Sequence, residues 1–100
     1  MARIETKGSK PAFIILTPTL CEGGVPSWWD EDGYPVTYES EREAQLEIAT
    51  MMIETLQQFI AAERDFEDAT TCDEFIVAVN VFPDRTIALE TGQIFGRRQP

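Results

Sequence analysis

The chain contains no histidine. Histidine is the commonest general base and the commonest transition-metal ligand in proteins, so its absence removes most hydrolytic and metal-dependent chemistry. The two cysteines, Cys21 and Cys72, form no Cys-x-x-Cys pair and have no histidine to activate them. We therefore expect two buried, unpaired thiols, with no disulfide and no nucleophilic role.

Long apolar runs are also missing. The longest, residues 13–16 and 75–79, are far shorter than the roughly 20 apolar residues that span a membrane. No apolar segment that would act as a secretion signal follows the leading basic residues. Gly23 and Gly24 are not followed by the Gly-Lys-Ser or Gly-Lys-Thr of a phosphate-binding loop. We expect a cytoplasmic protein with no membrane contact and no nucleotide cofactor.

Basic residues are scarce, and most lie near the ends. Residues 11–90 contain seventeen acidic side chains but only three basic ones, which gives this stretch a net charge of −14. Such a body repels nucleic-acid backbones and anionic lipids, and it attracts basic protein surfaces. Direct nucleic-acid binding is therefore not expected.

One hundred residues suffice for one hydrophobic core, and an apolar fraction of 43% argues against disorder. We predict a single domain over residues 11–96. The basic segments 1–10 and 97–100, which hold few apolar residues, are expected to be flexible.

Several short segments favour β-strands. Residues 12–17 and 74–82 are rich in β-branched and aromatic side chains, and residues 86–89 and 93–95 follow as shorter strands after a turn at 83–85. Residues 19–27 contain two glycines and a proline, which predicts a loop. Residues 28–31 and 34–38 flank Asp32-Gly33, a dipeptide typical of a two-residue hairpin turn, and Pro35 places the second arm near a sheet edge.

A long helix is predicted over residues 41–64. Ser40 and Glu43 form a capping box, which marks the start of a helix. On a helical wheel, the apolar side chains fall within about 80° of Leu56, which predicts a buried face. Glu43, Glu47 and Glu54 fall on the opposite side, and Met51 is also expected to face outward. The predicted fold is α+β, an antiparallel sheet of four to five strands with one long amphipathic helix packed on one face.

Acidic clusters invite two chemical readings. Aligning Gly33 with the glycine of an EF-hand loop places Asp30, Asp32 and Glu39 at calcium-ligand positions, but Trp28 then occupies the first one. A charged hairpin turn is the better interpretation. Paired carboxylates can also act as acid and base, but here nearly all lie in turns or on the outer helix side, away from any cleft. We expect no catalytic, cofactor-binding or metal-binding residues and no enzymatic activity.

Trp28 and Trp29 are adjacent, so on a strand they point to opposite sides of the sheet. Either both are partly buried, or one is an exposed aromatic anchor for a partner. With one helix available, a sheet face carrying Trp28, Tyr38 or Phe82 is left open as a contact surface in the second case.

In size, charge and layout, the chain resembles the small acidic anti-defence proteins of phages and mobile elements, in particular anti-CRISPR proteins and DNA mimics. The residues behind this resemblance are residues 30–32, the helical row Glu43, Glu47 and Glu54, residues 65–68, and Asp73 with Glu74. The resemblance implies a mechanism in which spaced carboxylates imitate phosphates and occupy the basic groove of a nucleic-acid-binding complex, for example a CRISPR effector complex in the cytosol of an infected host.

We therefore predict a protein-binding inhibitor. The predicted contact residues are the tryptophan pair and the acidic residues of the hairpin, the helix and the following segment: Trp28, Trp29, Asp30, Glu31, Asp32, Glu43, Glu47, Glu54, Asp65, Glu67 and Asp68. The alternative is a small accessory or regulatory subunit that forms a homodimer, or completes a larger assembly, through the open sheet face.

Overall fold

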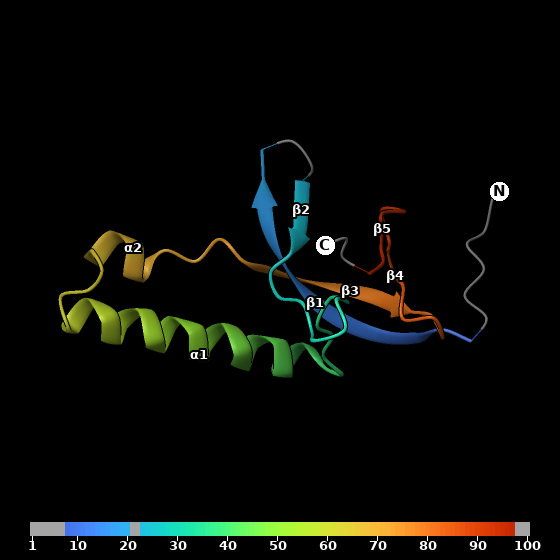
Figure 1. Ribbon diagram of the computed structural model, residues 1–100, viewed down its shortest axis with the longest axis horizontal. Coiled ribbons are helices and arrows are strands. Elements are labelled where there is room, and N and C mark those ends of the chain that lie inside the picture. Colours follow the sequence, from blue (N-terminus) through green and yellow to red (C-terminus); the bar gives the residue numbers. More distant parts are fainter. Residues whose placement is uncertain (1–7, 21–22, 98–100) are drawn as a thin grey trace.

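The computed structural model describes residues 8–20 and 23–97. The predicted α+β fold is confirmed: a curled five-stranded antiparallel sheet lies beside one long helix and one short one (Figure 1). The elements in chain order are β1 (Lys10–Thr19), β2 (Gly23–Pro26), α1 (Glu41–Ile60), α2 (Phe66–Thr70), β3 (Phe75–Val81), β4 (Ile87–Leu89) and β5 (Ile94–Phe95). The molecule is elongated, with principal extents of 52 × 28 × 28 Å.

The strand order of the sheet is β2-β1-β3-β4-β5. The pairing of β1 with β3 is the longest in the sheet. Ile14 pairs with Val77 and Ala12 with Val79, so these side chains share one face of the sheet. The core cluster lies on this face, inside the curl, and its buried members are Ala12, Ile14, Leu16, Val79, Ile87 and Leu89. Alternation along β1 places buried Ile15 on the opposite face.

The strand boundaries differ from those predicted. β1 begins at Lys10, inside the segment expected to be flexible, and continues past Pro18 to Thr19. The predicted loop at 19–27 contains β2, because Gly24 lets this strand approach β1 closely: a Cβ on Gly24 would lie 3.2 Å from a Leu16 methyl carbon. The expected flexibility of residues 1–7 and 98–100 concerns residues outside the described part of the chain.

Three turns share one design. In each, the amide of the first residue donates to the carbonyl of the fifth, and the amide of the fourth donates to the carbonyl of the first; the turns are 30–34, 82–86 and 89–93. This is a three-residue loop whose last member has positive φ, so the two-residue turn predicted at Asp32-Gly33 is wrong. Gly33 and Gly92 hold that position in two turns, and Arg85, with φ 72°, holds it in the third.

The capping box at the start of α1 is present in modified form. The hydroxyl of Ser40 accepts from the amide of Glu43 at 3.2 Å, as predicted. The Glu43 carboxylate reaches one residue further back than expected and accepts from the amide of Glu39 at 2.9 Å. Both bonds satisfy amides that the helix itself leaves unpaired.

The buried face predicted for α1 is largely wrong. Only Ala44, in the first turn of this helix, is buried; α1 contacts β1 and β3, and its C-terminal half extends past the sheet (Figure 1). Met51, expected to face outward, is half-buried. The helix therefore covers the sheet with one flank of its apolar face and presents the other flank to solvent.

α1 ends earlier than predicted because the chain turns back at Ala62. Ala62 has φ 64°, its amide donates to the carbonyl of Phe59, and the amide of Glu63 donates to the carbonyl of Gln58 at 2.8 Å. This is a Schellman motif with alanine at the left-handed position that glycine usually occupies. The following segment forms the short helix α2, which was not predicted from the sequence.

Ala62→Gly is expected to raise the free energy of unfolding by about 0.5–1 kcal/mol, because glycine adopts positive φ without the steric cost of a Cβ atom. Urea unfolding followed by circular dichroism measures this change. Ala61→Gly is the matched control, since Ala61 has φ −82° and gains nothing from glycine. Equal or lower stability of Ala62→Gly would contradict the assignment of strain to this residue.

Candidate protein-interaction surface

The acidic residues predicted to contact a partner do not form one patch. Those of the hairpin lie in the turn 30–34, those of α1 lie along the outer side of the helix, and those of α2 lie beyond its C-terminal end (Figure 1). A helix of 20 residues is about 30 Å long, so the acidic groups are spread over much of the molecule. The structure brings together Asp30 with Asp32 and, separately, Asp65 with Asp68.

Arg85 binds the acidic turn. Its guanidinium donates to Asp32 Oδ2 at 2.9 Å, forms an ion pair with Asp30, and lies 4.3 Å from the centre of the Tyr34 ring. Asp30 Oδ1 also accepts from the amides of Asp32 and Tyr34, at 2.9 and 3.0 Å. These contacts join the turn 82–86 to the turn 30–34, and they compensate for the positive φ of Arg85.

Because Asp30 and Asp32 are engaged with Arg85, they are less suited to binding a basic partner than the sequence suggested. Arg85 also lies where a calcium ion would have to bind. The hydrogen bond from the amide of Tyr34 is the main cause that holds the pKa of Asp30 below its usual value of 3.8; desolvation opposes it, and the charge of Arg85 adds a smaller lowering effect. Within residues 8–20 and 23–97, no group of three or more potential ligands is arranged to hold a metal ion.

Both tryptophans are half-buried, as are Tyr38 and Phe82. The amide of Val36 donates to the carbonyl of Trp28 at 3.1 Å, and Trp29 pairs with Pro35 across the hairpin. The first of the two readings of this pair, in which both side chains are partly buried, fits the structure better. Neither tryptophan stands out as an exposed anchor.

The acidic groups of α1 and α2 face solvent. Glu47 and Glu54 are exposed, and Glu43 is exposed although it also caps the helix. In α2, Glu67 and Asp68 are exposed, and Asp68 accepts from Arg64 at 3.0 Å. Glu31 and Asp65 are exposed as well, and Asp65 caps α2 without a side-chain hydrogen bond. These groups are available to a partner.

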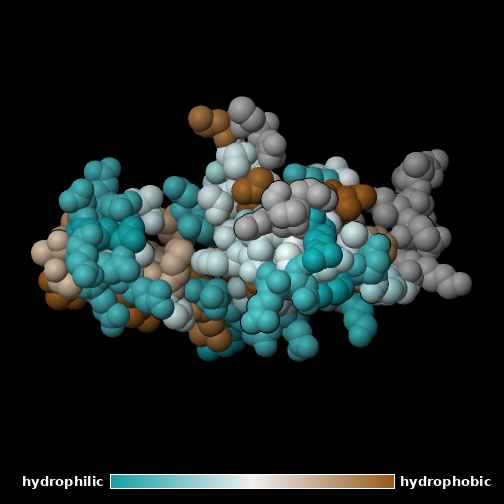
Figure 2. Space-filling model, viewed as in Figure 1, coloured by the Kyte–Doolittle hydropathy of each residue, from teal (hydrophilic) through white to brown (hydrophobic). Residues whose placement is uncertain are grey.

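Most of the exposed large apolar side chains among the described residues lie on α1. Leu46, Ile53 and Ile60 are 52%, 56% and 80% exposed, and Leu56 and Ala49 are exposed too. We call these five residues the apolar seam. Figure 2 shows apolar side chains along the lower edge of the region formed by α1 and α2, between hydrophilic neighbours. Contiguous exposed apolar surface of this kind marks sites of protein contact in folded proteins.

The seam is exposed because α1 is rotated. The side of the helix that carries Ala44, Met51 and Thr55 is the one turned toward other elements, and it lies about 120° around the helix from Leu56. The hydroxyl of Thr55 donates to the carbonyl of Ala69 at 3.0 Å and so anchors α2 on this side. The apolar face is thus wider than the sheet and α2 can cover.

α2 extends the apolar surface. Its Phe66 is exposed but packs edge-to-face on Phe59, with ring centres 5.2 Å apart. Ala69 is buried against α1. α1 and α2 therefore form one unit, the arm, which projects beyond the sheet and carries the seam on its surface (Figure 1).

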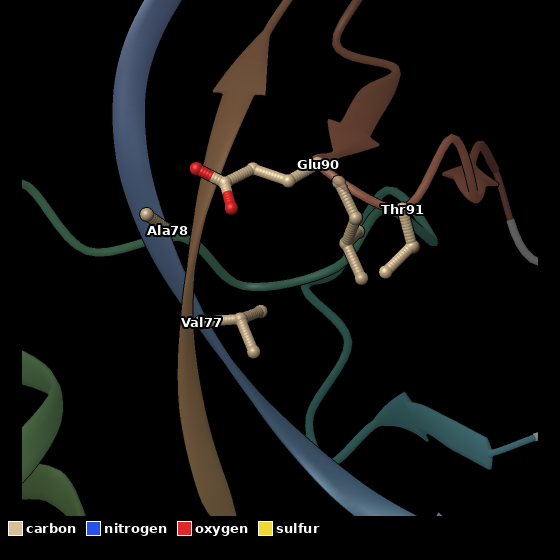
Figure 3. Close-up of a pocket in the computed structure, with 5 residues that line it drawn as sticks. Val77, Ala78, Glu90 and Thr91 are labelled. Atoms are coloured by element: carbon tan, nitrogen blue, oxygen red, sulfur yellow. The ribbon is translucent and has the colours of Figure 1, made fainter.

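A second feature is the open edge of β3. β4 pairs with residues 79–81 of β3, so the backbone groups of Ile76 and Ala78 that point away from β1 meet no strand among residues 8–20 and 23–97. A shallow pocket at this edge is lined by Val77, Ala78, Leu89, Glu90 and Thr91. Figure 3 shows the Glu90 side chain reaching across it toward β3, beside Ala78.

The thiol of Cys72 is free and exposed, which corrects the expectation of a buried cysteine. Partial desolvation, with a contribution from the charge of Glu74, raises the pKa of this thiol. Cys21 lies outside the described residues. Among the helices of the described chain, none is both long enough and apolar enough to cross a membrane.

Sequence reasoning assigned the seam to the core and so missed it as a contact surface. The signal was present in the spacing: the seam residues are separated by three, four, three and four positions, the pattern of a coiled-coil interface. The role of Arg85 carried no local signal, because the residues it binds lie more than 50 positions away. Comparison of the chain with protein-family models, curated proteins and solved structures gave no match.

Asp30→Asn is expected to lower stability at neutral pH and to flatten its loss in acid. Because folding lowers the pKa of Asp30, its contribution is present above the usual value of 3.8 and is lost as the pH falls through the lower folded-state pKa. Urea unfolding at neutral pH and at pH about 3 measures the difference. Glu31→Gln, which removes a carboxylate from the same turn without these bonds, should behave as wild type; an unchanged pH dependence for Asp30→Asn would contradict the linkage.

Proposed function

We propose that this protein is a non-enzymatic binding subunit that contacts another protein chain through the apolar seam of α1, with α2 beside it. The observation that carries the proposal is the exposure of large apolar side chains on an element that is itself well formed and capped. Free apolar surface on a strongly acidic protein lowers stability and solubility, and burial against a partner offsets both.

The chemistry of the surface favours a binding role over catalysis. The seam has no titratable group, and the carboxylate with the most hydrogen bonds, Asp30, is held by Arg85 and backbone amides rather than facing a cleft. A preformed helix costs little entropy to dock, because it is already ordered before the partner arrives. This proposal places the contact surface on α1, whereas the alternative stated from the sequence placed it on an open sheet face.

Site-specific photo-crosslinking tests this proposal. With the photoreactive residue p-benzoylphenylalanine at position 53, in the seam, we expect covalent adducts to a protein chain in cells of the native host. The same residue at position 37, which replaces exposed Thr37 before the start of α1 and outside both the seam and the acidic row, is the control and should give few adducts. Equal yields from both positions, or no adduct from position 53, would sink the proposal.

A second candidate function is the inhibition of a basic nucleic-acid-binding complex through the acidic row of Glu43, Glu47 and Glu54. Its support is the exposure of this row, whose carboxylates form no ion pair within the described part of the chain. Carboxylates at successive turns of a helix present spaced negative charges, as a nucleic-acid backbone does. The seam and the row lie on different sides of α1, so both can operate in one molecule.

The second candidate predicts salt-sensitive binding to a purified, guide-loaded CRISPR effector, used as the probe. The triple variant Glu43→Gln, Glu47→Gln and Glu54→Gln should bind about tenfold more weakly at low salt, because each exposed charge contributes a fraction of a kcal/mol. Fluorescence anisotropy at rising salt, with DNA as competitor, measures this. A triple variant of the same charge change made elsewhere, Glu31→Gln, Glu63→Gln and Glu90→Gln, is the control. Affinity that is absent, or independent of salt, would rule this candidate out for the probe used.

A further inference from the structure

We propose that the partner of the apolar seam is a second copy of this chain, docked so that the two α1 helices run antiparallel. This inference rests on the proposed function and names its partner. The argument draws on the spacing of the seam, the charges around it and its exposed area.

The spacing of the seam fits a helical partner. Leu46, Ile53 and Ile60 occupy the first position of a heptad, and Ala49 and Leu56 the fourth. Helices with this pattern pack their side chains into each other along a shared line. Since α1 presents the whole line to solvent, the same line on a second copy is a complementary surface.

The residues that flank the seam allow self-pairing despite the acidic charge of the protein. The flanking positions between residues 45 and 59 hold only uncharged side chains: Gln45, Thr50, Met52, Gln57 and Phe59. Glu47 and Glu54 lie on the far side of the helix, so two copies can meet without opposing carboxylates across the interface. A seam adapted to a basic protein would carry acidic groups at these flanks.

Arg42 sets the direction of the pair. It is exposed, lies four residues before Leu46 on the line of the seam, and forms no ion pair with another described residue. In a parallel pair the two arginines would lie side by side. In an antiparallel pair each Arg42 meets the C-terminal end of the other α1, where the free carbonyls of the helix carry negative charge and Glu63 and Asp65 follow.

This direction defines a register. With Arg42 opposite Ile60 of the second copy, Leu46 lies opposite Leu56, and Ala49 lies opposite Ile53. At the centre of the pair, the small side chain of Ala49 then meets the β-branched side chain of Ile53. In the layer on either side, Leu46 of one copy meets Leu56 of the other. Each layer joins a first heptad position to a fourth, as antiparallel packing requires.

The exposed area suffices for a dimer. A fully exposed large apolar side chain presents roughly 200 Å². At that value, the exposed apolar area is on the order of 600 Å² per copy, summed over Leu46, Ile53, Leu56, Phe59, Ile60 and Phe66. With the polar flanks, this approaches the roughly 800 Å² per partner of a standard interface. Because α1 is already folded in each copy, pairing does not have to order it.

Sedimentation equilibrium from about 1 to 100 μM tests the pairing. Wild type should be dimeric in the upper part of this range. Ile53→Gln should weaken dimerisation at least about tenfold, because each copy loses a buried apolar side chain. Glu54→Gln, which introduces the same side chain at the next position on the outer side, should dimerise as wild type. Since Ile53 is exposed in a single copy, circular dichroism of both variants should show an unchanged fold.

The direction is tested by exchanging charges. Arg42→Glu should weaken the dimer, and adding Glu63→Arg should restore it, because only antiparallel helices bring these positions together. A wild-type monomer at about 100 μM, or full dimerisation of Ile53→Gln, would overturn the inference. The photo-crosslinks separate this failure from that of the proposed function: adducts from position 53 to a different protein sink only the self-pairing, whereas no adduct at all sinks both.

Discussion

The pairing of β1 with β3 is the contact on which the rest of the fold depends. Its register places Ala12, Ile14 and Leu16 on one face with Val79, and the curl of the sheet closes that face into the core. The core is therefore built by the sheet alone, without the helix. This leaves α1 to cover only the outer face around Ile15, which needs little more than its first turns.

The helix consequently carries more apolar surface than the sheet requires. Within one chain, only the sheet and α2 are available to pack on α1. They cover the side of this helix that bears Ala44 and Thr55. The remaining flank, which carries the seam, is regular in spacing and free of charge between Leu46 and Ile60. Both the proposed binding role and the antiparallel pairing follow from this mismatch between the width of the apolar face and the surface available within one chain.

Much of the fold could be read from the sequence because its signals are local. The β-rich runs around Ile14 and Val77, the cap at Ser40 and the strands after residue 74 needed only propensity and pattern. The rotation of α1 could not be read in this way, because a helical wheel shows which side chains are apolar but not which flank a neighbour covers. The turn at 83–85 was predicted, although the positive φ of Arg85 carried no local signal, whereas the turn 30–34 was predicted one residue too short because Asp32-Gly33 also suits a two-residue hairpin. Sequence reasoning found the acidic residues of the candidate site but assigned the apolar seam to the core, because the helical wheel does not show which flank of α1 is covered.

The negative charge of the protein also bears on the open edge of β3. Unpaired strand edges join other edges unless something prevents it, and charged side chains are one of the means that proteins use. Here the Glu90 carboxylate lies over the apolar pocket beside Ala78, where it places a charge at the edge that an added strand would have to cover (Figure 3). Without that charge, the free backbone groups of β3 and the apolar pocket beside them would be open to edge-to-edge pairing with another strand.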